Sequence, residues 1–168
     1  MAGFHLAQVN IGRLRAPVDD PTMAGFKNQL APINALADSS AGFMWRLQTE
    51  DGDATAIKPF PDDALMAINM SVWASLEALL QFVYKSGHVG PLRDRREWFE
   101  PIDGPILVLW WVPVGHVPTV AEALARLDHL RQHGPTGHAF TFRAPFPPPG
   151  GEPTDVARLD AELCEWAS

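Results

Sequence analysis

Alternating residue types in two stretches of the chain predict β-strands. In residues 4–14 the even-numbered positions fall on one face of the strand and the odd-numbered positions on the other. Residues 64–73 alternate in the same way, and Asn69, Ser71 and Trp73 share one of the two faces. Because this shared face is both polar and aromatic, it fits the wall of a pocket better than a dry core.

Two further stretches complete a predicted set of four strands. Residues 42–50 place Trp45 on an apolar face, which makes it a core residue or at most a cavity-lining one. Residues 105–113 are apolar on both faces, as is typical of a strand that is buried on both sides.

Helical spacing of apolar residues predicts three helices. The first covers residues 23–40, and the second begins after Ser75, a residue type that caps helices. The third lies within residues 119–134, where a Thr-x-x-Glu capping box begins the helix and Gly134 ends it.

The order of these elements, β-α-β-β-α-β, predicts a ferredoxin-like α+β fold with an antiparallel sheet. The third helix and a short strand over residues 138–143 would follow it at the C-terminal end. The stretch "APFPPPGGEP" is a proline-rich linker, and a short tail helix follows it. We therefore expect one domain over residues 1–143, and a linker with its tail over residues 144–168 that is dispensable for folding.

Composition narrows the class of protein. The chain has 168 residues, 46% of them hydrophobic, which is enough for one domain with a sizeable core. Its net charge of -7 argues against nucleic acid or an anionic membrane as the main partner. A single cysteine excludes an internal disulfide, and neither a signal segment nor an apolar run of about 20 residues is present. We expect a cytoplasmic protein without a membrane partner.

The polar and aromatic face of the predicted sheet is the first candidate site. A ferredoxin-like sheet has helices on one face only, so we expect a second subunit to cover the other and form a homodimer with a cavity. The residues that would line this cavity are Gln8, Asn10, Asn69, Ser71 and Trp73. They suit a hydrophobic small molecule fixed by a few polar groups. The alternatives are a wet dimer interface without a ligand and, for Trp73, a plug at the end of a core strand.

The stretch "FVYKSGHVGPLRDRREWFEP" holds the second candidate. His88 follows the second helix, whose C-terminal end favours a protonated imidazole. Flanking glycines let the chain turn, so we expect His88 and Arg93 to face the cavity and Arg95 and Arg96 to face solvent or acidic neighbours. The alternative is a surface histidine beside a solvated basic face.

Metal binding has little support in the sequence. His129 and His133 have the i, i+4 spacing of a zinc-binding helix, but the Glu of the His-Glu-x-x-His pattern is missing between them. A phosphate-binding loop, a nucleophile elbow and a dinucleotide fingerprint are also missing from the sequence. We therefore expect no metal site.

Several stretches together carry a family resemblance. They include "HLAQVNIGRLRAP", "NMSVWASLEALLQFVYKSGH", "RREWFEP" and "LVLWWVPVGHVPTVAEALARLDHLRQHGPT". Over residues 4–143 the chain resembles the domain-of-unknown-function family 3291. The resemblance implies membership of the dimeric α/β-barrel superfamily, which also contains small antibiotic-biosynthesis monooxygenases and haem-degrading monooxygenases.

The resemblance also implies roles for particular residues. In cofactor-free, quinone-forming relatives an Asn-x-x-x-Trp pattern lines the pocket, and Asn69 and Trp73 match it. In haem-degrading relatives an Asn of the first strand, this Trp and a His after the second helix are the key groups. Asn10, Trp73 and His88 are their counterparts here, and Arg93 would meet a propionate or an acidic substrate group.

The resemblance, taken with the predicted pocket, implies a monooxygenase-like enzyme that acts on a hydrophobic aromatic or haem-like molecule. It would work without a cofactor or with haem, and Gln8, Ser71 and Trp45 would contact the substrate. The alternative is a non-catalytic small-molecule binder or an accessory protein of a biosynthetic pathway. A Soret band in the purified protein would favour haem.

Overall fold

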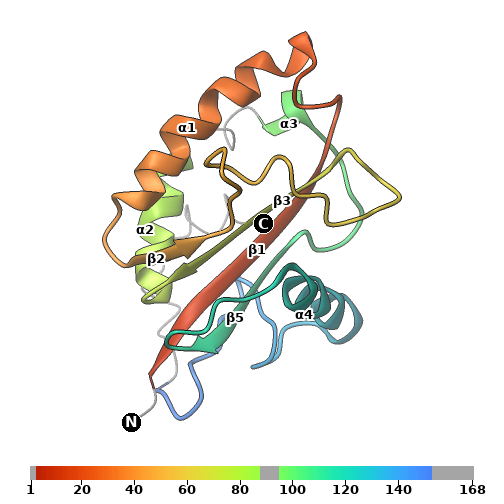
Figure 1. The fold of residues 1–168 in the computed structure, drawn as a ribbon. Helices are drawn as coiled ribbons and strands as arrows, with labels where there is room; N and C mark the ends of the chain where they lie inside the picture. Colours follow the sequence, from red (N-terminus) through yellow and green to blue (C-terminus); the bar gives the residue numbers. More distant parts are fainter. Residues whose placement is uncertain (1–2, 88–94, 153–168) are drawn as a thin grey trace.

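The computed structural model describes residues 3–87 and 95–152. In this part of the chain an open antiparallel sheet of five strands is combined with four α-helices, which confirms the α+β class (Figure 1). The strands are β1 (Phe4–Leu14), β2 (Phe43–Arg46), β3 (Met66–Trp73), β4 (Phe99–Glu100) and β5 (Leu107–Pro113). The helices are α1 (Ala24–Asp38), α2 (Leu76–Gly87), α3 (Arg95–Trp98) and α4 (Val120–His133), and a short 3-10 helix covers Pro21–Met23.

Strand β1 lies at the centre of the sheet. It pairs with β3 on one side and with β4 and β5 on the other, and β2 forms the outer edge next to β3. The register of β1 and β3 sets Gln8 opposite Ser71 and Asn10 opposite Asn69. The polar residues that the sequence places on one face of two strands therefore form one continuous patch.

Local capping explains where two of the helices begin and end. The Ser75 hydroxyl accepts a hydrogen bond from the Ala78 amide at 3.1 Å, and the Thr119 hydroxyl accepts one from the Glu122 amide at 3.1 Å. Gly134 ends α4 with a φ of 73°, a conformation that glycine adopts without strain. These caps confirm the helix boundaries predicted at Ser75, Thr119 and Gly134.

One face of the sheet packs against α1 and α2 of the same chain (Figure 1). Leu6 and Trp73 are fully buried there, together with Leu76 and Leu79 of α2. We expected a second subunit to cover this face and the helices to cover the other one. That expectation was wrong about the side, because two-residue alternation separates the faces of a strand without saying which face the helices cover.

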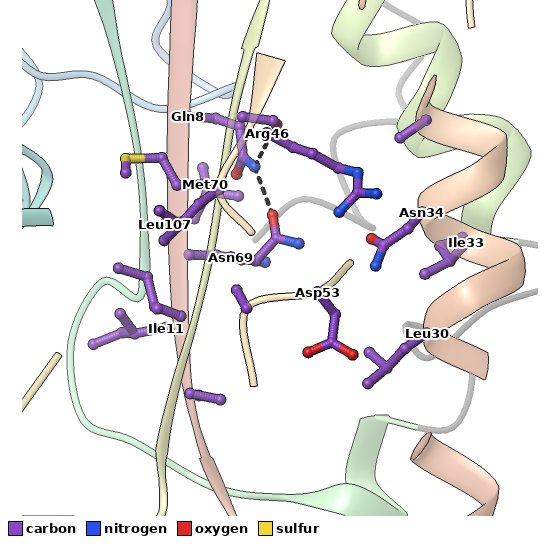
Figure 2. A pocket seen from close by; sticks show the side chains of 18 of the residues that line it. Gln8, Ile11, Leu30, Ile33, Asn34, Arg46, Asp53, Asn69, Met70 and Leu107 are labelled. Atoms are coloured by element: carbon purple, nitrogen blue, oxygen red, sulfur yellow. Dashed lines mark hydrogen bonds between the residues drawn. The ribbon is translucent and has the colours of Figure 1, made fainter. Parts of the chain in front are cut away.

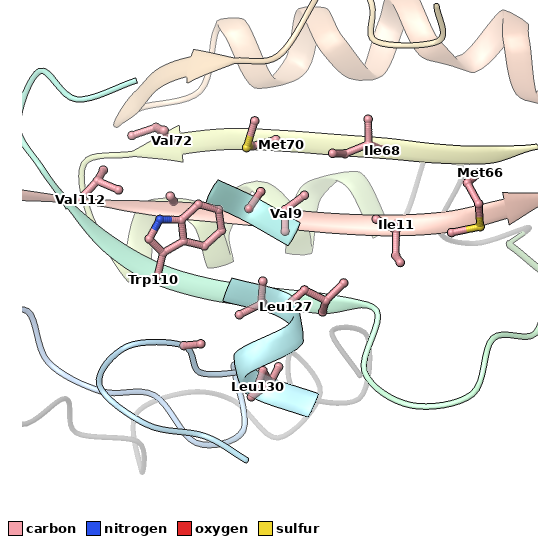
Figure 3. Packing of buried hydrophobic residues seen from close by; sticks show 14 residues of the cluster. Val9, Ile11, Met66, Ile68, Met70, Val72, Trp110, Val112, Leu127 and Leu130 are labelled. Atoms are coloured by element: carbon pink, nitrogen blue, oxygen red, sulfur yellow. The ribbon is translucent and has the colours of Figure 1, made fainter. Parts of the chain in front are cut away.

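The other face packs against α4. Val9, Met70 and Trp110 contribute to a buried apolar cluster with Leu127 and Leu130 of α4, as Figure 3 shows. The two sheet faces thus bury separate apolar clusters within one chain.

Two predicted segments differ from the observed ones. Strand β2 ends at Arg46, and only one further pairing bond follows, from the Leu47 amide to the Met70 carbonyl. Within residues 138–143 only Phe140 pairs with β5, opposite Leu109. Turns on both sides of Phe140 bend the chain away from the sheet, so no strand forms. The predicted tail helix lies outside the described residues.

The start of the proline-rich segment is packed on the domain. The Trp111 indole donates a hydrogen bond to the Phe146 carbonyl at 2.8 Å, and the Phe146 ring lies 6.0 Å from that of Phe140 between centroids. Packing therefore continues past the boundary expected after Arg143. No helix in residues 3–87 or 95–152 has the length and apolar character needed to cross a membrane.

Candidate functional site

A cavity of about 230 Å³ lies between the sheet and the helices α1 and α2. Its polar patch comes from β1 and β3, and Leu30 and Ile33 of α1 form the opposite wall (Figure 2). Helix α2 also contributes apolar lining residues, among them Leu79. The segment between β2 and β3 contributes Asp53 and Lys58 to the lining. The enclosure therefore combines an apolar wall with a few polar groups, as small-molecule sites do.

A chain of hydrogen bonds crosses the floor of the cavity. The Trp73 indole nitrogen donates to the Ser71 hydroxyl at 2.8 Å, and the Gln8 amide nitrogen donates to the same hydroxyl at 2.8 Å. The Gln8 nitrogen also donates to Asn69 Oδ1 at 2.8 Å (Figure 2). Gln8 and Ser71 are each only 6% exposed, so these partners replace water.

The network fixes the orientation of Asn69. Its oxygen is used by Gln8, so its amide nitrogen remains for the cavity, into which the side chain projects (Figure 2). Asn10 lines the cavity beside it, and Asn34 of α1 lies on the opposite side. The cavity thus offers an oriented N–H donor on a largely apolar background, which suits a carbonyl or phenolate oxygen.

Arg46 enters the cavity from the end of β2. Its guanidinium binds both carboxylate oxygens of Asp38, at 2.8 and 3.2 Å, and also donates to the Gly52 carbonyl at 2.7 Å. The side chain is only 12% exposed, so the pair is partly shielded from solvent. This arrangement ties the end of α1 to β2 and uses most of the donors of Arg46 within the protein.

Asp53 presents a carboxylate to the same space. Its Oδ1 accepts hydrogen bonds from the Thr55 amide at 2.9 Å and from the Thr55 hydroxyl at 2.6 Å. Figure 2 shows this carboxylate in the cavity, between Asn69 and the α1 residue Leu30. With one oxygen held by Thr55, the other is placed to accept a proton or a hydrogen bond from a ligand.

Arg95 lines the cavity beside Phe99, with its guanidinium carbon 5.2 Å from the centre of the Phe99 ring. Burial lowers the pKa of the Arg95 guanidinium from its ordinary value. We expected Arg95 to face solvent or acidic neighbours, and this was wrong because the Arg95 side chain lies over Phe99 of β4 and lines the cavity. Arg96, the next residue, is exposed as expected.

The structure brings together five of the residues predicted for the site. Gln8, Asn10, Asn69, Ser71 and Trp73 all line the cavity. Trp73 is also fully buried and stacks on Phe82, so it is at once a core residue and part of the cavity wall.

The remaining predicted residues do not join them. Trp45 packs on the opposite face of the sheet, against the apolar cluster that includes Trp110. Its neighbour Arg46 lines the cavity in its place, because successive strand residues point to opposite faces. His88 and Arg93 lie outside the described residues.

Sequence reasoning missed Asn34, Arg46 and Asp53. Arg46 carried a usable signal, since it alternates with Trp45, but the strand pairing that sets it opposite Ser71 is needed to choose its face. Asp53 and Thr55 have the Asp-x-Thr spacing of a local side-chain turn. That spacing predicts the turn and does not predict which part of the sheet the turn lies against.

Residues of this cavity fit haem poorly. His, Cys, Tyr and Met side chains bind haem iron. Of these, the described lining holds only Met70, which packs in the apolar cluster on the other face of the sheet. The cavity of about 230 Å³ also lies below the about 300–1,000 Å³ usual for drug-sized ligands, and haem is larger than most of those. Within residues 3–87 and 95–152 no group of three or more His, Cys, Asp or Glu side chains could hold a metal ion.

These features define an α+β protein whose open antiparallel sheet and own helices enclose a small, mostly apolar cavity with an amide network on its floor. The family model described as "Domain of unknown function (DUF3291)" matches residues 5–156, and the chain belongs to this family. Comparison with curated proteins and with solved structures finds no match.

Proposed function

We propose that the chain is a monooxygenase-like enzyme that oxidises a small aromatic molecule in the cavity without a cofactor. The observation that carries the proposal is the pair of groups on either side of the ligand space. Asn69 offers an N–H donor held in place by Gln8, and Asp53 offers a carboxylate oxygen. Asn69 itself is exposed, so the donor and the proton acceptor face a largely apolar cavity at its open side, an arrangement that suits the formation of an enolate or phenolate.

The reaction class is oxidation of an activated CH2 group to a carbonyl by O2. Asp53 would take a proton from the CH2 group, and the Asn69 amide would stabilise the negative charge on the conjugated oxygen. The carbanion carbon then bonds to O2 and is oxidised, and protonation gives a hydroperoxide. Loss of water leaves the carbonyl, so the substrate carbon supplies all four electrons that O2 accepts and no external reductant is consumed.

Anthrone is a suitable probe, because it is a fused aromatic ketone with one activated CH2 group. We expect O2 uptake to accompany formation of the quinone in equal amounts. Asn69→Leu should lower the rate by about 100-fold or more, as loss of one oxyanion donor does. Asn28→Leu is the control, since Asn28 is exposed on α1 and does not line the cavity.

The experiment separates the proposal from its alternatives. Binding of anthrone without O2 uptake would leave the cavity as the site of a non-catalytic binder. A Soret band in the protein as purified would instead favour a haem-dependent reaction, with the iron ligand supplied from outside the described residues. Equal rates for Asn69→Leu and Asn28→Leu would contradict the role given to the amide network.

The same proposal extends to the fold. The antiparallel order β2-β3-β1 followed by β5, with α1 after β1 and α2 after β3, supports the ferredoxin-like arrangement implied by the resemblance. An experimental structure that returned the same order, with α1 and α2 on one face, would bear this out. A homodimer also stays a prediction, and its interface would use a surface other than the Trp73 face, which is buried within one chain.

A further inference from the structure

The cavity carries an excess of positive charge in an acidic protein. Its charged lining side chains are Arg46, Asp53, Lys58 and Arg95. Arg46 is neutralised by Asp38, whereas neither Lys58 nor Arg95 forms an ion pair within the described part of the chain. Asp19, the ion-pair partner of Lys27, also attracts Lys58, whereas no acidic group among the described residues acts on Arg95, although the whole chain has a net charge of -7. One unbalanced charge suits a ligand with a single negative group.

The donor Asn69 and the cation Arg95 lie at different places along the sheet. Asn69 is opposite Asn10 of β1, and Phe99, under the Arg95 guanidinium, is opposite Leu14. Four residues of a strand separate these two positions of β1, which is about 13 Å. The side chains that line the space between are mainly apolar, so an extended and flat ligand would fill it.

We infer that the cavity takes an elongated aromatic acid, with a phenol or enol oxygen at Asn69 and a carboxylate at Arg95 and Lys58. A carboxylate suits the planar Arg95 guanidinium, which can bind both its oxygens at once. Lys58 is exposed and lies at the edge of the cavity, where it draws an anion toward the opening. The inference rests on the ligand site of the proposed function and is independent of any oxidation there.

Three naphthalenes test it by direct binding to the full chain. The first is 6-hydroxy-2-naphthoate, which carries the two groups at opposite ends, the second is its methyl ester, and the third is 2-naphthoate. We expect the ester to bind about tenfold more weakly than the acid, because a charge-assisted hydrogen bond is lost. Loss of the hydroxyl should weaken binding about fivefold.

Variants connect each preference to one residue. Arg95→Met should weaken binding of the acid about tenfold and leave binding of the ester unchanged. Arg96 is the exposed neighbour of Arg95 on α3, and Arg96→Met should change the affinity for neither ligand. Lys58→Met should cause a smaller loss of affinity for the acid. If Arg95→Met does not fold, the Lys58 variant tests the carboxylate site in its place. Asn69→Leu should remove the preference for the hydroxyl and keep the preference for the acid.

The outcomes separate this inference from the proposed oxidation. Acid-selective binding that depends on Arg95 or Lys58 supports it, whether or not any of these ligands or anthrone is oxidised. Equal binding of acid and ester to the wild-type chain, no binding of any of the three, or equal losses in the Arg95 and Arg96 variants would overturn it. Oxidation of anthrone with no preference for the acid would keep the proposed function and reject the carboxylate.

Discussion

Ser71 connects the aromatic and the amide parts of the cavity floor. One hydroxyl accepts hydrogen bonds from Trp73 on its own strand and from Gln8 on the neighbouring strand. The indole N–H can only donate a hydrogen bond, so a buried Trp73 needs an acceptor such as this hydroxyl. The same hydroxyl holds the Gln8 amide, which in turn donates to Asn69. Ser71 therefore helps to orient Asn69, the side chain that would contact the ligand.

Replacement of Ser71 by alanine should therefore destabilise the protein by about 1–3 kcal/mol, because two buried donors lose their acceptor. Thermal or urea unfolding measures the loss. Ser39→Ala is the matched control, since that hydroxyl is exposed after α1 and donates only to the Leu36 carbonyl. Equal stability of the two variants would mean that water replaces the hydroxyl and that the network contributes little.

Asp53 is the residue expected to affect the rate and spare the fold. Asp53→Asn keeps an oxygen that can accept the two Thr55 hydrogen bonds, but it removes the proton acceptor. We expect anthrone oxidation to fall by about 100-fold or more with binding unchanged. Asp51→Asn, in the same turn and exposed, should keep the wild-type rate. Full activity of the Asp53 variant would assign the proton to another group.

At the level of elements, the junction between α1 and β2 depends on Gly42. Its φ is 81°, and a Cβ atom placed there would lie 2.6 Å from the Ala78 Cβ of α2. Its carbonyl also accepts a hydrogen bond from the Ala74 amide at 2.7 Å. Only a glycine allows both the left-handed turn and the close approach of α2 to the start of β2.

Gly42→Ala and Gly52→Ala separate these two requirements. Gly52 has a similar φ of 86° but no atom within 4 Å of a new Cβ. Both variants should lose about 1–2 kcal/mol for the left-handed backbone, and Gly42→Ala should lose about 1–3 kcal/mol more from the contact with Ala78. Denaturant unfolding of the two variants measures the difference. Equal losses would show that α2 moves away freely at this point.

Glu122 gives the first turn of α4 a dependence on pH. Burial of its carboxylate raises the pKa, but the hydrogen bonds from His116 and Trp110 together lower it by more. The net pKa therefore lies below its ordinary value of 4.5. A depressed pKa in the folded state stabilises the fold above pH 4.5, and this contribution is lost as the pH falls through the folded pKa. Glu122→Gln should therefore be less stable than the wild type at pH 7 and lose less on acidification. Parallel stability curves of the two proteins between pH 7 and pH 3 would contradict this account.

Much of this element structure was predictable, and the exceptions have a common reason. Strand β1 and the start of α2 follow from alternation and from a capping serine, which are local signals. The short elements α3 and β4 were missed because a four-residue helix and a two-residue strand are too short to show a period. In the site, the shared face of Gln8 and Ser71 was predicted from their own strands. The addition of Asp53 depends on how a loop folds over the sheet, which no local pattern encodes.

For the whole molecule, both faces of the sheet are covered by elements of one chain. The expected exposure of Leu6 and Trp73 was the reason for predicting a dimer across their face. Both are fully buried within one chain, in a cluster with residues of α1, α2 and the segment that holds Phe140 and Phe142. That reason no longer applies. Light scattering of the full chain tests the homodimer that the resemblance implies, and a dimer would place its interface outside the cavity described above.

The extent of the folded unit is the last whole-molecule property to be tested. The domain was expected to end at Arg143, with the rest dispensable. However, Phe146 is half-buried against Phe140, and its carbonyl accepts the hydrogen bond of the Trp111 indole. Removal of residues 144–152 would take away Phe146, expose part of the buried Phe140 ring and leave the Trp111 indole N–H to water. The loss should be about 2 kcal/mol from the apolar area and the hydrogen bond together.

Two shortened chains isolate this contribution, one ending at Glu152 and the other at Arg143. We expect the chain that ends at Arg143 to melt about 4–8 °C lower than the chain that ends at Glu152. Phe146→Ala in the full chain should reproduce most of the shift, and Glu152→Ala, an exposed position, should not. Equal melting temperatures for the two shortened chains would restore the boundary at Arg143, because the contacts of Phe146 would then add nothing to the stability of the domain.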